Sequence, residues 1–162
     1  MEEISNFSLQ KHEGPYEKWP QQTILYFDNV DTNIKVRGFI IEAQYKCEFG
    51  YLLIISQDCP FEESNDFILL NNKFEVIAKN ELWALFGTYL LSAHWPIDKN
   101  TLRLHYCGEN FYDMTVIKCS KSANSVSIDL KEFSEYKSDK KSMESIERKK
   151  QQEADLFSGK YD

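Results

Sequence analysis

The chain is poor in cysteine, proline and glycine, and no segment is apolar enough to span a membrane. Its 162 residues include four cysteines, four prolines and six glycines, and no apolar run approaches the ~18 residues that a membrane span needs. Residues 1–5 lack the basic and apolar parts of a secretory signal peptide. We therefore expect a cytoplasmic protein whose cysteines stay reduced.

The four cysteines do not form a metal or disulfide pattern. They stand twelve residues apart in two pairs, Cys47 with Cys59 and Cys107 with Cys119. Along a strand, at about 3.3 Å per residue, each pair would be separated by too great a distance for a disulfide. No C-x-x-C is present for zinc, and we expect no metal and no cofactor.

Positive charge is also scarce. The chain has 19 basic and 26 acidic side chains, a net charge of −7. Residues 131–162 hold eight of each sign, so the whole excess lies in residues 1–130, with 11 basic and 18 acidic side chains. This charge disfavours nucleic acid and anionic membranes as ligands. It favours a basic protein partner instead.

Sequence motifs of catalysis are missing, with one weak exception. There is no G-x-G-x-x-G, P-loop, G-x-S-x-G or H-E-x-x-H. If strands over 88–95 and 101–106 pair with Leu102 and Leu104 inward, then His94, Arg103 and His105 share the outer face. Two imidazoles and a guanidinium could cleave a phosphodiester, one His as base and the other as acid. A one-residue slip would separate the histidines, and ordinary polar residues on a solvated sheet face explain the same pattern.

Aromatic and aliphatic residues are abundant and arranged in short runs between turn signals. Aromatics make up 14% of the chain, and they favour pleated, half-buried surfaces. We predict a mainly β (α+β) fold, an antiparallel β-sandwich or strongly curled sheet of 8–9 strands with a C-terminal α-helix. The expected strands are 23–28, 36–47, 51–56, 67–70, 74–78, 88–95, 101–106, 111–118 and 125–130.

Some local features refine this prediction. Residues 51–55 are apolar at every position, which places that strand centrally and covered on both faces. Residues 1–22 are expected to be irregular, and Asp31-Thr32-Asn33 to form a turn. Residues 80–86 show helical spacing, so a helical turn competes with a strand there.

The composition changes near residue 138, which divides the chain into a β domain over 1–137 and a charged helix and tail over 138–162. The helix, of about 18–20 residues, has only a thin apolar stripe of Met143, Ile146, Ala154 and Phe157. Two readings stay open: a surface helix docked weakly on the body, or a helix that orders against a partner or a second copy.

An acidic loop follows the central strand and carries no basic residue. Its candidate binding residues are Asp58, Phe61, Glu62, Glu63 and Asp66. The order of carboxylates does not match the alternating scaffold of a calcium loop. The carboxylates could complement a basic protein surface, with Phe61 as an apolar anchor. A plain solvated loop is the alternative.

In these features, and in its Asp58-Cys59-Pro60-Phe61-Glu62-Glu63 stretch, the chain resembles the immunity proteins of bacterial toxin–immunity and contact-dependent inhibition systems. The resemblance implies tight one-to-one binding of a cognate toxin domain, often a nuclease, whose active site is blocked. On that interpretation the protein is not an enzyme. The alternatives are a phosphodiester-cleaving enzyme that uses His94 and His105, and a self-associating adaptor that dimerises through its C-terminal helix.

Overall fold

The computed structural model describes residues 1–57, 63–85, 87–118 and 125–158. Within these ranges the chain forms twelve strands, two short 3-10 helices and one α-helix. The elements are β1 (Glu2–Glu3), β2 (Phe7–Leu9), η1 (Tyr16–Lys18), β3 (Thr23–Phe27), β4 (Val30–Val36), β5 (Ile40–Cys47), β6 (Gly50–Ser56), β7 (Asn65–Leu70), β8 (Val76–Leu82), β9 (Leu91–Pro96), β10 (Thr101–Tyr106), β11 (Phe111–Lys118), β12 (Val126–Glu132), η2 (Tyr136–Ser138) and α1 (Lys140–Phe157).

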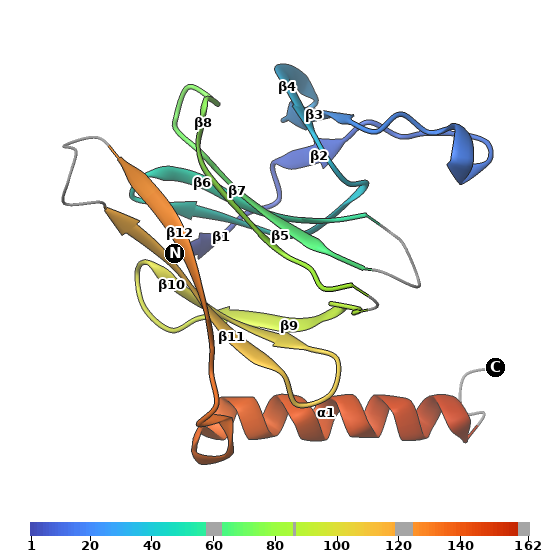
Figure 1. Ribbon diagram of the computed structural model, residues 1–162, viewed down its shortest axis with the longest axis vertical. Helices are drawn as coiled ribbons and strands as arrows, with labels where there is room; N and C mark the ends of the chain where they lie inside the picture. The colour runs from blue at the N-terminus through green and yellow to red at the C-terminus, as the bar shows by residue number, and fades with distance from the viewer. Residues whose placement is uncertain (58–62, 86, 119–124, 159–162) are drawn as a thin grey trace.

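The strands form three antiparallel sheets. The middle sheet has the order β1-β5-β6-β7-β8, the outer sheet β2-β3-β4, and the helix-side sheet β12-β11-β10-β9. Figure 1 shows the middle sheet between the other two, with α1 on the far side of the helix-side sheet. The prediction of a mainly β, sandwich-like fold with a C-terminal helix is confirmed.

Strands β6 and β7 are buried on both faces because the middle sheet is covered from both sides. Side chains on one face join a cluster with the outer sheet, and those on the other face a cluster with the helix-side sheet. Along β6, Leu53 and Ile55 enter the first cluster, whereas Leu52 and Ile54 enter the second. A strand with two buried faces reads as a continuous apolar run. The prediction of a central strand over 51–55 is thus confirmed.

Several predictions differ from the structure. The described ranges contain twelve strands instead of 8–9, and residues 1–22, expected to be irregular, include β1, β2 and η1. Two further differences concern a turn and a helical turn. The chain turns at Asp28 and Asn29, which both have positive φ, and residues 31–33 lie inside β4 rather than in a turn. Strand β8 continues to Leu82, which pairs with Asn65 of β7, so the first residues of 80–86 are strand and not helix. In both places pairing with a neighbouring strand outweighs the local pattern.

The N-terminal half of α1 packs on the helix-side sheet. The carboxylate of Asp139 caps the helix by accepting from the backbone N–H of Ser142 at 2.9 Å. Arg103 binds both Asp113 and Asp139, at 2.8 and 3.2 Å, and so links the sheet to the cap. Nowhere in the described ranges is there a helix long and apolar enough to span a membrane.

Candidate partner-binding surface

Three hollows meet at one side chain, Arg37, at the end of β4. The arm hollow, of about 480 Å³, is lined by residues of the N-terminal arm, which is the segment 10–22. The strand hollow, of about 410 Å³, lies over β7 and β8. The end hollow, of about 360 Å³, lies at the C-terminal end of β8. All three hollows are lined in part by Arg37, and together they are called here the Arg37 surface.

Gly38 fixes how the chain passes through this surface. Its φ is +106°, and a Cβ there would lie 2.6 Å from the carbonyl oxygen of Ser56. Only glycine accommodates both the dihedral angle and the close approach. The backbone N–H of Phe39 then donates to the same oxygen at 2.8 Å, which anchors the segment that carries Arg37 against the end of β6.

Arg37 is held by two carboxylates. Its guanidinium donates two hydrogen bonds to Asp66, with Nε to Oδ2 at 3.0 Å, and one to Glu81 at 2.6 Å. The hydrogen bond with Asp66 is the main cause that raises the pKa of Arg37, against an opposing effect of burial. Asp66 and Glu81 are opposite each other on β7 and β8, and one guanidinium therefore holds both carboxylates in fixed positions.

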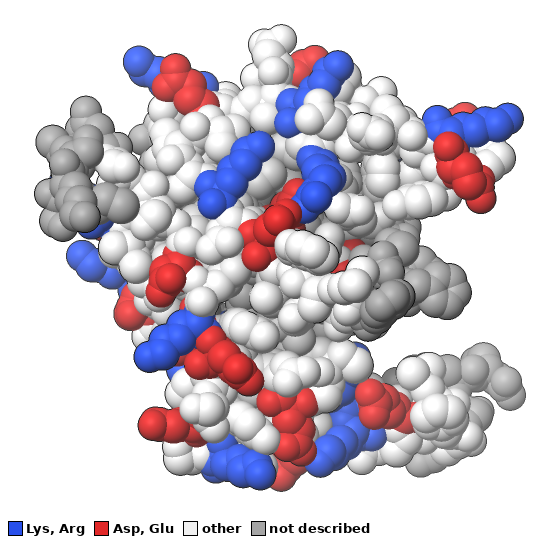
Figure 2. Space-filling view, in the orientation of Figure 1, with Lys and Arg blue, Asp and Glu red and all other residues white. Residues whose placement is uncertain are grey.

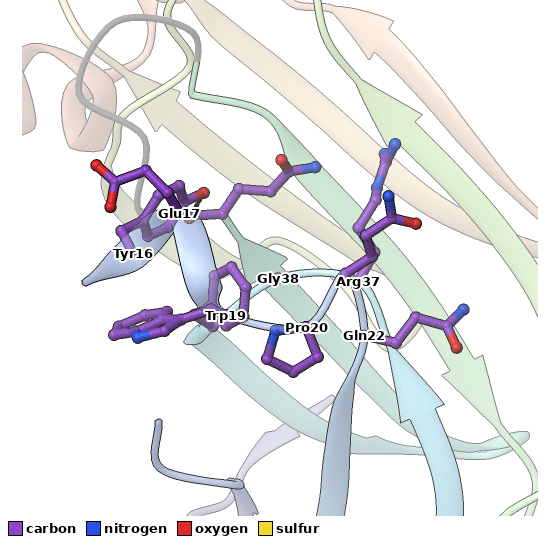
Figure 3. A pocket seen from close by; sticks show the side chains of 10 residues that line it. Tyr16, Glu17, Trp19, Pro20, Gln22, Arg37 and Gly38 are labelled. Carbon is purple, nitrogen blue, oxygen red and sulfur yellow. Dashed lines mark hydrogen bonds between the residues drawn. The ribbon is translucent and has the colours of Figure 1, made fainter. Parts of the chain in front are cut away.

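Aromatic side chains build the wall of the arm hollow. Tyr16, Trp19 and Phe39 pack edge to face or tilted, with ring centroids 5.0 to 5.7 Å apart. Figure 3 shows Tyr16, Glu17 and Trp19 on the side of the arm and Arg37 across from them. The Tyr16 hydroxyl also donates to the carbonyl oxygen of Gln57 at 3.2 Å. The arm, expected to be irregular, is thus fixed by aromatic rings and by this hydrogen bond to Gln57.

The end hollow carries two large apolar side chains that face solvent. Trp83 is 59% and Leu85 71% exposed, and both line this hollow together with Glu63 and Ser64. Large exposed apolar side chains beside carboxylates are typical of protein-binding surfaces.

The predicted loop residues fall partly within this surface. Asp58, Phe61 and Glu62 lie outside the described residues. Glu63 is 4% exposed, and its carboxylate accepts from the backbone N–H of Gln57 at 2.8 Å. Asp66 is paired with Arg37. Glu63 and Asp66 therefore adjoin the Arg37 surface, and the assignment of these five residues to partner binding stays a prediction.

Sequence reasoning missed Arg37, Glu81, Trp83 and Leu85 as members of this surface. Trp83 and Leu85 could have been found from the sequence, because they are apolar residues in a segment where a strand pattern ends and where no strand partner would cover them. Nothing in the sequence indicated that Arg37, 29 residues before Asp66, would bind it. That contact depends on how the outer sheet lies on the middle sheet.

The structure separates the two histidines of the enzymatic alternative. His94 pairs with Leu104 and His105 with Ala93, so the register is shifted by one residue from the one expected, and the histidines point to opposite faces of the sheet. Nδ1 of His94 lies 2.6 Å from the hydroxyl of Tyr45 in the middle sheet. The phosphodiesterase geometry is therefore wrong for this fold.

His105 is fully buried under α1. Its Nε2 donates to the carbonyl oxygen of Gly108 at 2.9 Å, so Nδ1 of the neutral ring accepts from the hydroxyl of Ser145 at 2.8 Å. Its ring stacks on Phe111. Burial lowers the pKa of His105, as it does for His94. Both rings are therefore neutral structural groups in the folded protein.

Among the described residues no group of three or more His, Cys, Asp or Glu is placed to hold a metal ion, and Cys47 and Cys107 are free thiols. In Figure 2 acidic and basic side chains are interspersed over the face shown.

No protein-family model, no curated protein and no solved structure matches this chain.

Proposed function

We propose that this protein is an immunity-type inhibitor that binds and neutralises a basic, nuclease-type toxin domain through the Arg37 surface and the adjoining loop. The observation that carries the proposal is the Arg37 surface itself: three adjoining hollows with exposed apolar side chains and fixed carboxylates. Anchoring apolar side chains in a polar, charged rim is the usual make-up of a protein interface.

Charge supports a basic partner. The excess of acidic residues lies in residues 1–130. The lining of the three hollows is itself almost balanced, with four acidic side chains (Glu17, Glu63, Asp66 and Glu81) and three basic ones (Lys35, Arg37 and Lys79). Asp66 and Glu81 are the carboxylates that Arg37 holds, and Asp58 and Glu62 are two further acidic residues of the loop in the sequence. A nuclease-type domain needs a cationic groove to hold phosphates. An anionic surface with apolar anchors could occupy such a groove and exclude the substrate.

The test first asks whether a neighbouring open reading frame encodes a large secreted protein, and then uses the C-terminal domain of that protein. Expressed alone, this domain should arrest growth, and co-expression of the present chain should restore it. Purified together, the two proteins should form a one-to-one complex in light scattering. Growth arrest that co-expression does not relieve, or the absence of a complex, would refute the proposal.

Variants then locate the interface. Asp58→Asn with Glu62→Gln should lower the association rate about tenfold at low salt and flatten its salt dependence. Trp83→Ser with Leu85→Ser should instead raise the dissociation rate, since these side chains act as anchors. Val76→Ser is the matched control, because Val76 is 41% exposed at the other end of β8 and lines none of the three hollows.

A further inference from the structure

Helix α1 rests on the helix-side sheet through few buried side chains. Of its 18 residues, Ser142, Ser145 and Ile146 are buried, and only the last of these is apolar. Neither of the two apolar clusters contains a residue of α1. Figure 1 shows the helix lying across the sheet beside the turn between β10 and β11. An element with so small an apolar contact opens at a lower free energy than the sheets do.

A buried histidine lies beneath the helix and binds it. His105 of β10 is 0% exposed, and its ring stacks on Phe111 with the ring centroids 4.3 Å apart. Nε2 donates to the carbonyl oxygen of Gly108 at 2.9 Å, and Nδ1 accepts from the hydroxyl of Ser145 on α1 at 2.8 Å. A protonated ring would donate from both nitrogens, so the Ser145 hydroxyl would lose its acceptor. The bond between sheet and helix therefore depends on the protonation state of His105.

The surroundings of the ring oppose a positive charge on it. Burial is the largest cause that lowers the pKa of His105, and the cation of Lys149 on α1 lowers it too, against the opposing effect of the Gly108 carbonyl. Both hydrogen bonds of the ring are made with neutral oxygen atoms. An imidazolium at this position would be desolvated and would lie near a like charge.

The other charged groups around this site are engaged with one another. They are Arg103 on β10, Asp113 on β11, Asp139 at the helix cap, Glu109 in the turn, Lys137 on η2 and Lys150 on α1. The guanidinium binds both aspartates, at 2.8 and 3.2 Å, and Glu109 accepts from the hydroxyl of Tyr136 at 2.6 Å. On β9 the residue opposite His105 is Ala93, which is uncharged. In the part of the chain that the structure describes, no carboxylate forms a hydrogen bond with the His105 ring.

We infer that α1 is a strap that opens in acid: protonation of His105 releases the helix from the helix-side sheet while the β body stays folded. Lifting α1 brings water to the imidazolium and takes Lys149 away from it, so the charged ring favours the lifted state. It also uncovers the face of the sheet that carries Arg103 and Phe111. The body keeps both apolar clusters, which contain no side chain of the strap.

The direction of the pH dependence follows from the two states of the ring. In the docked state the pKa of His105 lies below its ordinary value, and in the lifted state, with the ring in water, it returns to about 6.5. Docking is therefore strongest above about pH 6.5 and weakens as the pH falls toward the docked-state pKa. Because one proton is taken up, the lifted population should rise by at most about tenfold between about pH 7.5 and pH 5.5.

Hydrogen exchange of the full chain at these two pH values, corrected for the intrinsic exchange rates, tests this inference. Residues 142–149 should exchange up to about tenfold faster at the lower pH, while β6 and β7 stay far better protected than α1 at both. His94→Gln should leave the pH dependence of α1 unchanged, because that ring lies on the opposite face of the sheet, against Tyr45.

Two further variants change the protonation of His105. His105→Gln removes the titrating group, and Lys149→Glu places an anion near the imidazole, which raises its docked-state pKa toward the lifted-state value. Both should flatten the pH dependence of exchange in α1. Lys149→Glu keeps the imidazole in place, so it is the decisive variant if His105→Gln loosens α1 at every pH. Arg148→Glu, the matched control, makes the same charge change at an exposed neighbouring position and should keep the native pH dependence.

Three outcomes would overturn the inference. They are exchange of α1 that is equally fast at both pH values, loss of protection of α1 together with β6 and β7, and a pH dependence that survives in both His105→Gln and Lys149→Glu. The strap requires no partner protein, so this inference and the proposed function can fail separately.

Discussion

At the scale of single residues, Arg37 is the side chain on which the candidate surface depends most. Arg37→Ala leaves Asp66 and Glu81 facing each other without a cation. Because Arg37 and Glu81 are each 48% exposed, we expect a loss of only about 1 kcal/mol in the free energy of unfolding. Urea denaturation measures it. Lys35→Ala is the control, since Lys35 takes part in no ion pair among the described residues, and its loss should cost less.

The same variant should change partner binding more than stability. Without Arg37 the two carboxylates gain freedom, so the proposed partner would meet a more negative but less ordered surface. We expect faster association and faster dissociation. Surface plasmon resonance separates the two rates. Unchanged binding kinetics would place the interface elsewhere.

The buried histidines predict a pH dependence of stability. Burial lowers the pKa of His94 and of His105 in the folded state, so below about pH 6.5 the unfolded chain binds more protons than the folded chain. Stability is therefore full above that pH and falls as the pH drops toward the folded-state values. Urea denaturation at pH 7.5 and at pH 5.5 should show the loss. A variant with both His94→Gln and His105→Gln should lose most of this slope, and an unchanged slope would contradict the assignment.

At the scale of elements, α1 is held to the sheet chiefly through its N-terminal cap. Asp139→Ala removes the hydrogen bond to the Ser142 N–H and one of the two carboxylates on Arg103. Loss of a cap costs about 1 kcal/mol, and Arg103 keeps Asp113 as its ion-pair partner. Hydrogen exchange should become faster in residues 140–157 and stay slow in β6 and β7. Asp155→Ala is the control, and it should not speed exchange, because an acid in the last turn opposes the helix dipole.

The elements that sequence reasoning predicted correctly are those whose pattern is long and dominated by burial. Residues 51–55 could be placed as a central strand because both faces are apolar, and α1 could be recognised from its length without glycine or proline. Strands β2 and β4 could not be recognised, since the first is short and the second is polar, and both depend on β3 for pairing. His94 was assigned to the wrong face because strict alternation was assumed along residues 88–95. The register shifts opposite His105 and Tyr106, so that Ala93 pairs with His105 and Leu91 with Tyr106, and no local pattern encodes this irregularity.

The candidate surface was predictable only in part. The acidic loop stood out in the sequence, and its ends, Glu63 and Asp66, adjoin the hollows. The hollows themselves arise where the outer sheet leaves part of the middle sheet uncovered, which is a property of how layers overlap rather than of any one segment. Contacts such as Arg37 with Glu81, 44 residues apart in the chain, are therefore beyond the reach of spacing arguments.

At the scale of the whole molecule, the middle sheet makes folding cooperative, because both clusters share β6 and β7. Leu52→Ala opens a cavity toward the helix-side sheet and Leu53→Ala one toward the outer sheet. Both side chains are fully buried, so each change should cost about 2–5 kcal/mol. In each variant, unfolding followed by Trp19 emission should coincide with unfolding followed by Trp95 emission, with the other tryptophans replaced by Phe. Separate transitions would show two independently folding halves.

The position of Arg37 also affects how the Arg37 surface could change in evolution. Arg37 lines all three hollows. Its replacement by a longer, shorter or uncharged residue would therefore change the shape of the whole Arg37 surface at once. The loss of fold stability would be small, because that residue is half exposed and the two clusters beneath it are untouched. If the proposed function holds, a single codon change could thus alter which partner is recognised while the scaffold stays intact.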